Sequence, residues 1–481
     1  MNRKMILNLL GLILLIEGAL LLLPFVAGLC YGEAVLLPFG IPIAILLSLG
    51  VLLMREKPDR QSFYAKEGFV VVSLSWVLMS LFGALPFWLS GEVPSFIDCF
   101  FETVSGFTTT GATILPNVEA LSNGLLLWRS FTQWVGGMGV LVFLLAILPT
   151  AGQHAIHLMR AELPGPSVGK LVPKLQETAS ILYRIYIVLT LLLVALLCLC
   201  GMSLFDSLIH AFGTAGTGGF SNYAASVGHF NSPLIEWIIT VFMILFGVNF
   251  NLFYLALCGQ LLQALRSEEL RWYFGIIVGA IVLVSWNTAP SYGSLSTAVR
   301  TAAFQVAAIT TTAGYATTDY NVWPMFSKVI LMLLMVVGAC AGSTGCGIKV
   351  SRLILMAKSA VQAMRRMLHP RAVTLVKLDD KPVGEGVLNG VFAYMICYIG
   401  MLAGSVLLLA LEPLSLESIF SGALACLSNI GPGLDALGPT SHFGGLSNLS
   451  KLVLSFDMLV GRLEIFPMLL LFRPSFWKRG Y

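Results

Sequence analysis

Four short stretches of glycine and small residues are the part of this sequence best suited to chemistry, namely the binding of a cation by oxygen atoms. They read TTGA at 109–112, TGGF at 217–220, TAGY at 312–315 and NIGP at 429–432. Rings of backbone carbonyl oxygens can replace the hydration shell of a cation. Glycine permits the backbone angles that consecutive inward carbonyls need, which a β-carbon resists. Four such stretches around one axis would form a selectivity filter.

The sixteen positions of these stretches contain no carboxylate, which favours a monovalent cation. A ring of Asp or Glu would better suit a pore that selects divalent cations. The alternative for any one stretch is a surface of small residues on which membrane helices pack closely. Because the pattern occurs four times in similar surroundings, we favour a filter.

The sequence predicts no enzyme. A Ser-His-Asp arrangement, zinc-ligand spacing and a nucleotide-binding phosphate loop are absent from it. The nine cysteines have no C-x-x-C spacing, so we expect neither a metal site nor a disulfide framework. We expect His154 and His157 to be solvated loop residues, and His210 to pack inside a helix, with a pH-sensing role as the alternative.

Each stretch follows a segment too short to cross a membrane and precedes a longer apolar run. The short segments are 95–107, 203–215, 296–309 and 415–427. Segments of this length are more often re-entrant than spanning. The proposed register superposes Gly111, Gly219, Gly314 and Gly431, at separations of 108, 95 and 117 residues. The sequence therefore predicts a fourfold repeat of helix, short helix, polar loop and helix.

Polar residues near the start of the short segments indicate their orientation. Asp206 in the second segment, and Ser415 and Glu417 in the fourth, are typical of helix N-termini, which we place at the outer surface. The C-termini then point into the membrane and carry the negative ends of the helix dipoles. Four such ends meeting at mid-membrane would favour a cation.

The composition places most of the chain in lipid. It is 57% hydrophobic and 11% charged, with a mean hydropathy of +0.88, whereas soluble domains carry roughly 25% charged residues. Apolar runs at 6–28, 38–54, 180–200 and 273–285 have spanning or near-spanning length. We interpret the first run as a retained helix, because it lacks a clean cleavage site for a signal peptidase.

The predicted fold is an all-α polytopic membrane protein. Its four helix–pore loop–helix repeats are arranged with pseudo-fourfold symmetry around one pore, after two N-terminal helices. The predicted divisions are 1–66 for the N-terminal helices and 67–160, 161–267, 268–380 and 381–481 for the repeats.

The distribution of basic residues predicts cytoplasmic N- and C-termini. When the chain is threaded in this way, 23 of its 28 Lys and Arg lie on or at the edge of the cytoplasmic side, as the positive-inside rule requires. The basic loops are therefore topology signals, and nucleic acid is not an expected partner. The remaining five are Arg129, Arg300, Lys328 and Lys451, placed outside, and Arg462, placed within a helix.

A second glycine-rich segment, GACAGSTGCGIK at 338–349, interrupts the second long helix of the third repeat. Each glycine costs roughly 1 kcal/mol relative to alanine in a helix, so we expect an intramembrane loop that lines the pore. The alternative is a face for close helix packing. The candidate residues are Gly338, Gly342, Ser343, Thr344, Gly345, Gly347 and Lys349.

Arg462 lies within an apolar helix, where a charge is costly and marks a candidate functional site. Asp457 and Glu464 are five and two residues away, so neither has the helical spacing of an ion-pair partner. The alternative is an arginine that extends to the cytoplasmic interface.

At TVSGFTTTGAT (103–113), GTGGFSN (216–222), TTTAGYATTDY (310–320) and SNIGPGLD (428–435), the sequence resembles the Trk/Ktr/HKT superfamily of potassium transporters. The bacterial Trk-type potassium uptake subunits are the nearest branch. The resemblance covers nearly the whole chain and implies K+ uptake through a channel-like pore. The filter residues that it implies are Thr109, Thr110, Gly111, Ala112, Thr217, Gly218, Gly219, Phe220, Thr312, Ala313, Gly314, Tyr315, Asn429, Ile430, Gly431 and Pro432.

The resemblance has further implications. It implies that the segment 338–349 and Arg462 gate the pore below the filter, and that no cofactor is needed beyond the transported K+. It implies a homodimer in the bacterial inner membrane. It implies a separate cytosolic nucleotide-binding subunit of the RCK type, which would dock on basic segments including 151–178 and 349–381. Coupling of K+ uptake to H+ or Na+ symport comes from the family's description alone.

Each loop has one matched glycine instead of the longer motif of tetrameric K+ channels, which predicts that Rb+ passes and that Na+ is excluded less strictly. Two other classes of protein were weighed. A secondary transporter of inverted repeats would show two-part symmetry, whereas the pattern repeats four times. A membrane enzyme or scaffold would need a catalytic cluster or a large soluble domain.

Overall fold

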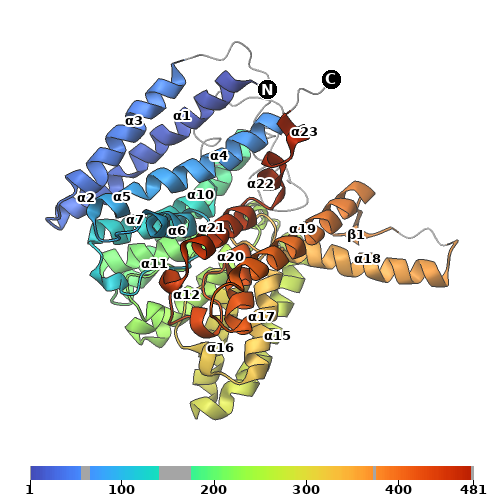
Figure 1. Cartoon of the computed structure of the whole chain (residues 1–481). Coiled ribbons are helices and arrows are strands. Elements are labelled where there is room, and N and C mark those ends of the chain that lie inside the picture. Colours follow the sequence, from blue (N-terminus) through green and yellow to red (C-terminus); the bar gives the residue numbers. More distant parts are fainter. Residues whose placement is uncertain (1, 56–64, 140–174, 372–374, 478–481) are drawn as a thin grey trace.

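The computed structural model describes residues 2–55, 65–139, 175–371 and 375–477. In these ranges the regular secondary structure is helical, apart from the strand pair β1 (Lys377–Leu378) and β2 (Lys381–Pro382) (Figure 1). The two loop histidines, most of the predicted docking segment 151–178 and the predicted division at 160/161 lie outside the described residues.

Two apolar helices at the N-terminus pack against each other and against the first repeat. A β-carbon on Gly11 would lie 2.8 Å from the carbonyl oxygen of Gly50, so the two backbones approach closely through small residues. Figure 1 shows these helices side by side at one edge of the molecule. The elements are α1 (Arg3–Leu20), α2 (Leu22–Cys30), a π-turn at Leu36–Gly40 and α3 (Ile41–Met54).

Four repeats follow, each with a first helix, a short helix and a second helix. The first helices are α4 (Ala65–Gly83, continued by α5, Leu85–Ser90), α10 (Leu175–Leu199), α15 (Glu268–Tyr292) and α19 (Glu385–Leu409). The short helices are α6 (Phe96–Phe107), α11 (Leu204–Gly216), α16 (Leu295–Thr310) and α20 (Leu416–Leu427). The second helices are α7 (Asn123–Gly137), α12 (Pro233–Phe246), α17 (Met325–Val337) and α21 (Asn448–Arg462).

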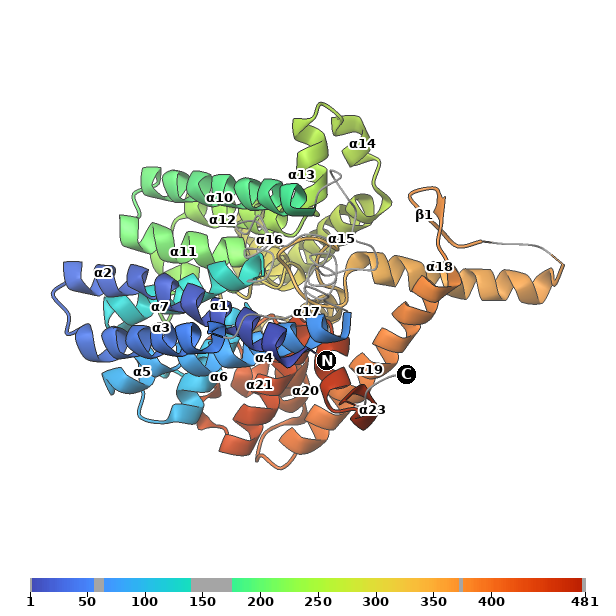
Figure 2. The ribbon, with the colours of Figure 1, turned by 90° about the horizontal axis from the view of Figure 1, so that it is seen from above.

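The remaining elements lie beside these repeats. Short 3-10 turns follow the four loops, at Val118–Ala120, Ser226–Phe230, Tyr320–Val322, Asp435–Leu437 and Phe443–Gly445. Four shorter helices follow the second helices of repeats two and four. They are α13 (Phe250–Leu257) and α14 (Leu261–Leu265) after α12, and α22 (Phe466–Leu471) and α23 (Pro474–Trp477) after α21. Helix α18 (Val350–Leu368) extends away from the rest of the molecule and carries the strand pair beside it, as Figure 2 shows.

Six helical segments are long and apolar enough to cross a membrane, by length and composition, and a bent pair raises the number to seven. The pair is α12 and α13, which meet at 93°. The six segments are Arg3–Cys30, Leu36–Met54, Lys66–Ser90, Glu177–Leu199, Glu268–Tyr292 and Glu385–Leu409. The short helices are absent from this set, and so are the second helices α7, α17 and α21.

All four short helices begin at a serine N-cap. The residues are Ser95, Ser203, Ser294 and Ser415. In three of them the hydroxyl accepts a backbone N–H of the first turn, which satisfies a donor that the helix leaves open. The only one without this bond is Ser294, whose side chain makes no cap hydrogen bond. A serine in the sequence thus marks the start of each short helix.

Ion pairs at equivalent places cross three of the four interfaces between neighbouring repeats. In each, the fourth residue of a second helix pairs with the short helix of the next repeat. The pairs are Glu236–Arg300 at 2.9 Å, Lys328–Glu417 at 3.3 Å and Lys451–Asp98 at 2.6 Å. Three of the four basic residues that the sequence placed outside thus serve as ties, and the third pair closes the ring from repeat four to repeat one.

We expect Lys451→Met and Asp98→Asn each to lower the free energy of unfolding, because each leaves the partner's charge without its counter-ion. The Lys451 side chain is only 6% exposed. The double variant should recover part of the loss, with a coupling energy of about 0.5–3 kcal/mol. Thermal unfolding in detergent measures all four proteins. Additive losses would show that the pair does not tie the two repeats.

Candidate cation pathway

Each short helix ends in the same hydrogen-bonded turn, which places the four predicted filter loops in one conformation. Thr109 N donates to Gly106 O at 3.0 Å, and Thr110 N donates to Ser105 O at 2.8 Å. Corresponding pairs of bonds close the other three helices, at distances of 2.7–3.2 Å. This is the Schellman arrangement, in which a left-handed residue terminates a helix. The left-handed residues are Thr109, Thr217, Thr312 and Asn429.

The backbone alternates in handedness along each loop. The left-handed residue is followed by one of negative φ and then by the matched glycine, whose φ is again positive. The four glycines have φ values of 82° at Gly111, 74° at Gly219, 68° at Gly314 and 104° at Gly431. In each loop the N–H groups of the left-handed residue and of the residue after it donate back to the helix end. A β-branched threonine at positive φ is strained, and such strain concentrates at functional sites.

The four loops meet one another in a closed ring. A β-carbon on Gly111 would lie 2.0 Å from Gly218 O in the second loop. One on Gly219 would lie 2.0 Å from Ala313 O, and one on Gly314 would lie 2.1 Å from Ile430 O. The ring closes where Gly431 would place a β-carbon 2.6 Å from Thr110 O. The four glycines that the sequence superposes are therefore equivalent, and each lies against a carbonyl of the next loop.

A buried ion pair supports the first two loops from behind. Arg129 on α7 is 3% exposed, and its Nε lies 2.6 Å from Glu102 Oε1 on α6. Glu102 Oε2 accepts Ile114 N at 2.9 Å, and Arg129 Nη1 donates to Ser221 O at 2.8 Å. The distribution of basic residues places Arg129 on the outer side. In the structure, the pair and its hydrogen bonds hold the ends of both loops.

His210 is packed, which agrees with the first of the two readings of this residue. It is fully buried on α11. Its Nδ1 lies 2.8 Å from Asp206 O, which can only accept, so Nδ1 carries the proton. Its Nε2 lies 3.0 Å from the hydroxyl oxygen of Ser221. The ring also lies 5.8 Å from that of Tyr315, so the imidazole links the second and third loops.

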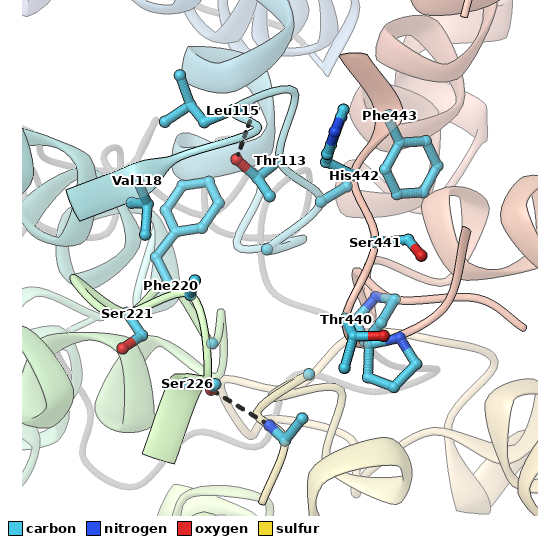
Figure 3. A pocket seen from close by; sticks show the side chains of 18 of the residues that line it. Thr113, Leu115, Val118, Phe220, Ser221, Ser226, Thr440, Ser441, His442 and Phe443 are labelled. Atoms are coloured by element: carbon cyan, nitrogen blue, oxygen red, sulfur yellow. Dashed lines mark hydrogen bonds between the residues drawn. The ribbon is translucent and has the colours of Figure 1, made fainter. Parts of the chain in front are cut away.

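A cavity of about 110 Å³ opens on one side of the ring. Gly111, Gly219, Gly314 and Pro432 line it, so every loop contributes. Figure 3 shows its walls, with Thr113 and Phe220 on one side and Thr440, Ser441 and His442 on the other. It provides an approach to the ring for a small ion.

The segment 338–349 forms no helix and packs against the other side of the ring. Cys346 N donates to the hydroxyl of Thr312 at 2.8 Å, directly at the third loop. A β-carbon on Gly345 would lie 2.9 Å from Thr311 O, so glycine is needed for this approach. Gly338, Gly342 and Gly347 have positive φ values, as does Lys349. A continuous helix is incompatible with this backbone.

Neighbouring elements hold this segment at both ends. Glu269 Oε1 on α15 accepts Ala341 N at 2.8 Å and Ser351 N at 3.1 Å. Phe250 N donates to Gly342 O at 3.0 Å, and the Thr344 hydroxyl donates to Phe246 O at 3.1 Å. The last two contacts come from the bend between α12 and α13. The loop therefore rests on the first helix of its own repeat and on the broken helix of repeat two.

Arg462 connects the segment to the first repeat. Its Nη1 donates to Thr344 O at 3.1 Å, lies 3.0 Å from Cys346 Sγ and lies 3.4 Å from Thr109 Oγ1. Its Nη2 donates to Gly137 O at 2.7 Å and also to Gly136 O. These contacts turn the side chain toward the ring, whereas an arginine that extends to the interface would point away from it.

Two further cations lie at the end of the segment and just after it. Lys349 is 1% exposed, and its ammonium donates to Gly345 O within the segment. Arg352 pairs with Glu464, and its guanidinium lies 4.0 Å above the ring of Tyr394. Glu464 thus serves Arg352 and not Arg462, in agreement with the helical spacing in the sequence.

The structure brings together both groups of residues that the sequence singled out. The sixteen filter candidates form the ring, and the gate candidates lie directly beneath it. Sequence reasoning missed Glu102, Glu269 and Gln133. Glu102 is a carboxylate in largely apolar surroundings, a signal that could have been followed. Sequence reasoning also expected one broken helix, whereas α12 and α21 likewise end near this level.

Comparisons with known proteins agree with this architecture. Residues 39–479 match the TrkH family, described as cation transport proteins. The chain is similar to the "Trk system potassium uptake protein TrkH" of Salmonella typhimurium, with 37% identity over 99% of this chain and 100% of that protein. It is also similar to the TrkG protein of Escherichia coli, with 32% identity over 99% of each chain.

A solved structure has the same fold. The crystal structure of the potassium transporter TrkH from Vibrio parahaemolyticus superposes with a TM-score of 0.89 and 34% identity, and covers 99% of this chain and 100% of that one. The predicted fold class, a polytopic helical membrane protein of four repeats, is confirmed, as is the prediction of a transport protein and not an enzyme. The chain belongs to the TrkH family of cation transport proteins.

Proposed function

We propose that this protein takes up K+ through a channel-like pore whose selectivity filter is the ring of four loops. The observation that carries the proposal is the closed ring, in which each matched glycine meets a carbonyl oxygen of the next loop. Relatives named as potassium uptake proteins along their full length support K+ as the ion. Rb+, which resembles K+ in size, is expected to pass as well.

In this proposal the cation leaves its hydration shell at the outer cavity and is bound by loop carbonyls. The C-terminal ends of α6, α11, α16 and α20 add partial negative charge at the ring. Such dipoles bind a monovalent ion reversibly, which conduction requires. Carboxylates are absent from the sixteen ring positions, so that a divalent ion would not be held there.

The segment 338–349 is the proposed gate. It lies against the ring, and Arg462 ties it to the first repeat. The guanidinium also places positive charge on the path of a cation that leaves the filter. Opening would require the segment to withdraw and the Arg462 contacts to break.

Partners and location belong to the same proposal. We infer a homodimer in the bacterial inner membrane with both termini in the cytoplasm. A cytosolic nucleotide-binding subunit of the RCK type would contact the basic segment 349–381, part of which lies on the protruding helix α18. Coupling to H+ or Na+ is proposed from the family resemblance. An imposed pH or Na+ gradient across a proteoliposome would test it.

Growth on low K+ tests the proposed function. We expect expression of the chain to restore growth of a bacterium that lacks its own K+ uptake systems, because the chain supplies the pore. The same strain carrying an empty vector, and growth at high K+, are the controls. Failure to restore growth, with the protein present in the membrane together with a Trk-type regulatory subunit, would contradict K+ uptake.

A further inference from the structure

One interface in the ring of repeats is built differently from the other three. The second helices can be placed in a common register, because Gly136 and Gly461, each fourteenth in its helix, meet Phe107 O and Leu427 O at equivalent points. The three ion pairs give the same register for repeats two to four. The eleventh residues of the four helices are Gln133, Met243, Met335 and Met458, all fully buried. The first repeat alone has an amide at this position.

The amide of Gln133 holds the backbone of the second loop. Its Nε2 donates to Gly218 O at 2.7 Å, and its Oε1 accepts Phe220 N at 3.0 Å. A carbonyl can only accept and an N–H can only donate, so both ends of the amide are specified. The side chain therefore bridges across Gly219, the matched glycine of this loop.

Gly218 of the second loop makes room for this side chain. A β-carbon on Gly218 would lie 2.4 Å from Gln133 Cδ, and one on Gly216 would lie 2.2 Å from the backbone oxygen of Gln133. One on Gly213 would lie 2.2 Å from the Tyr315 hydroxyl and 3.1 Å from Gln133 Oε1. Every position that corresponds to Gly218 in the other repeats has a side chain: Thr110, Ala313 and Ile430. Gly218 and the amide therefore fit one another.

We propose that Gln133 is a specificity-determining residue, which fixes the second loop and thereby resists contraction of the ring around an ion smaller than K+. The inference deepens the proposed function and rests on it. Na+ is smaller than K+, so its coordination requires the carbonyls to move inward. The amide opposes this movement at the second loop by holding the peptide groups on both sides of Gly219. Methionine offers neither a comparable donor nor a comparable acceptor.

The test uses the purified full chain in liposomes, with 86Rb+ uptake in the presence of rising Na+ or K+. For Gln133→Met we expect Na+ to inhibit at a concentration roughly three- to ten-fold lower, the range that the net loss of hydrogen bonds supports, with inhibition by K+ unchanged. Gln133→Glu keeps the shape and the acceptor for Phe220 N but loses the amide donor, and should shift in the same direction. If Gln133→Met does not fold, Gln133→Glu alone tests the inference.

Gln305→Met is the matched control, because it removes another fully buried glutamine whose amide donates to Thr317 Oγ1 at 3.4 Å and not to filter backbone. We expect its Na+ inhibition to equal that of the unmodified chain. A change in the folded fraction alters total uptake but not the relative inhibition by Na+ and K+. A purely structural role of Gln133 would therefore leave this relative inhibition unchanged. Unchanged Na+ inhibition in both Gln133 variants would overturn the inference. Uptake by the unmodified chain that K+ does not inhibit would instead overturn the proposed function.

Discussion

Gly219→Ala should lower the discrimination between K+ and Na+ roughly ten-fold or more. The new β-carbon would lie 2.0 Å from Ala313 O, closer than any two such atoms can approach. The residue also has a φ of 74°, where a β-carbon costs roughly 1–2 kcal/mol, and 1.4 kcal/mol corresponds to a factor of ten. The second and third loops must therefore separate, which opens the ring. Competition of Na+ with 86Rb+ uptake measures the effect.

Three further variants show whether the effect belongs to the ring. Gly431→Ser should be milder than Gly219→Ser, because the nearest atom to its added β-carbon is 2.6 Å away instead of 2.0 Å. Gly275→Ala is the control, since this glycine of α15 has no atom within 4 Å of an added β-carbon. Unchanged ion ratios for Gly219 and Gly431 variants that fold normally would remove both glycines from the filter.

Arg462→Ala should raise the basal flux, by about ten-fold if its contacts contribute the 1.5–3 kcal/mol typical of hydrogen bonds to charged groups. The substitution removes the donors to Thr344 O and Gly137 O, and with them the tie between the proposed gate and the first repeat. It also removes a positive charge beneath the ring. The rate of 86Rb+ uptake by liposomes without a regulatory subunit measures the effect.

A conservative variant separates the two causes. Arg462→Lys keeps the charge but cannot reach as many acceptors, so a rise in flux with lysine would assign the gate to the contacts, and no rise would assign it to the charge. Deleting 342–347 should also raise the flux. Arg365→Ala, on the exposed part of α18, is the control. Wild-type flux in Arg462→Ala would show that this arginine only contributes to packing. Reduced flux in a folded deletion variant would show that the segment 342–347 contributes to packing and does not gate the pore.

Features that depend on the local composition of the chain could be predicted from the sequence. The short helices begin at serines and end at loops of small residues, and both signals lie within about fifteen residues of chain. The left-handed turns after α6 and α11 follow from the same stretches. The interruption at 338–349 could be anticipated because four glycines and a lysine cannot continue a spanning helix.

Features that depend on pairing between distant segments could not be predicted. The partner of Lys451 is Asp98, 353 residues earlier in the chain. Glu269 is 72 residues from the segment that it anchors, and it lies in the first turn of α15, where acidic residues are typical of any helix N-terminus. Gln133 can be compared with the three methionines only after the second helices are placed in a common register. That register comes from contacts in the packed ring.

The most direct test of the central claim is 86Rb+ uptake into liposomes that hold the purified chain, with K+, Na+ and Li+ as competitors. A four-loop filter for K+ predicts uptake that K+ blocks and that Na+ and Li+ inhibit only at much higher concentration. Equal inhibition by all three cations would contradict a K+-selective ring. So would the absence of uptake in Arg462→Ala, the variant in which the proposed gate is released.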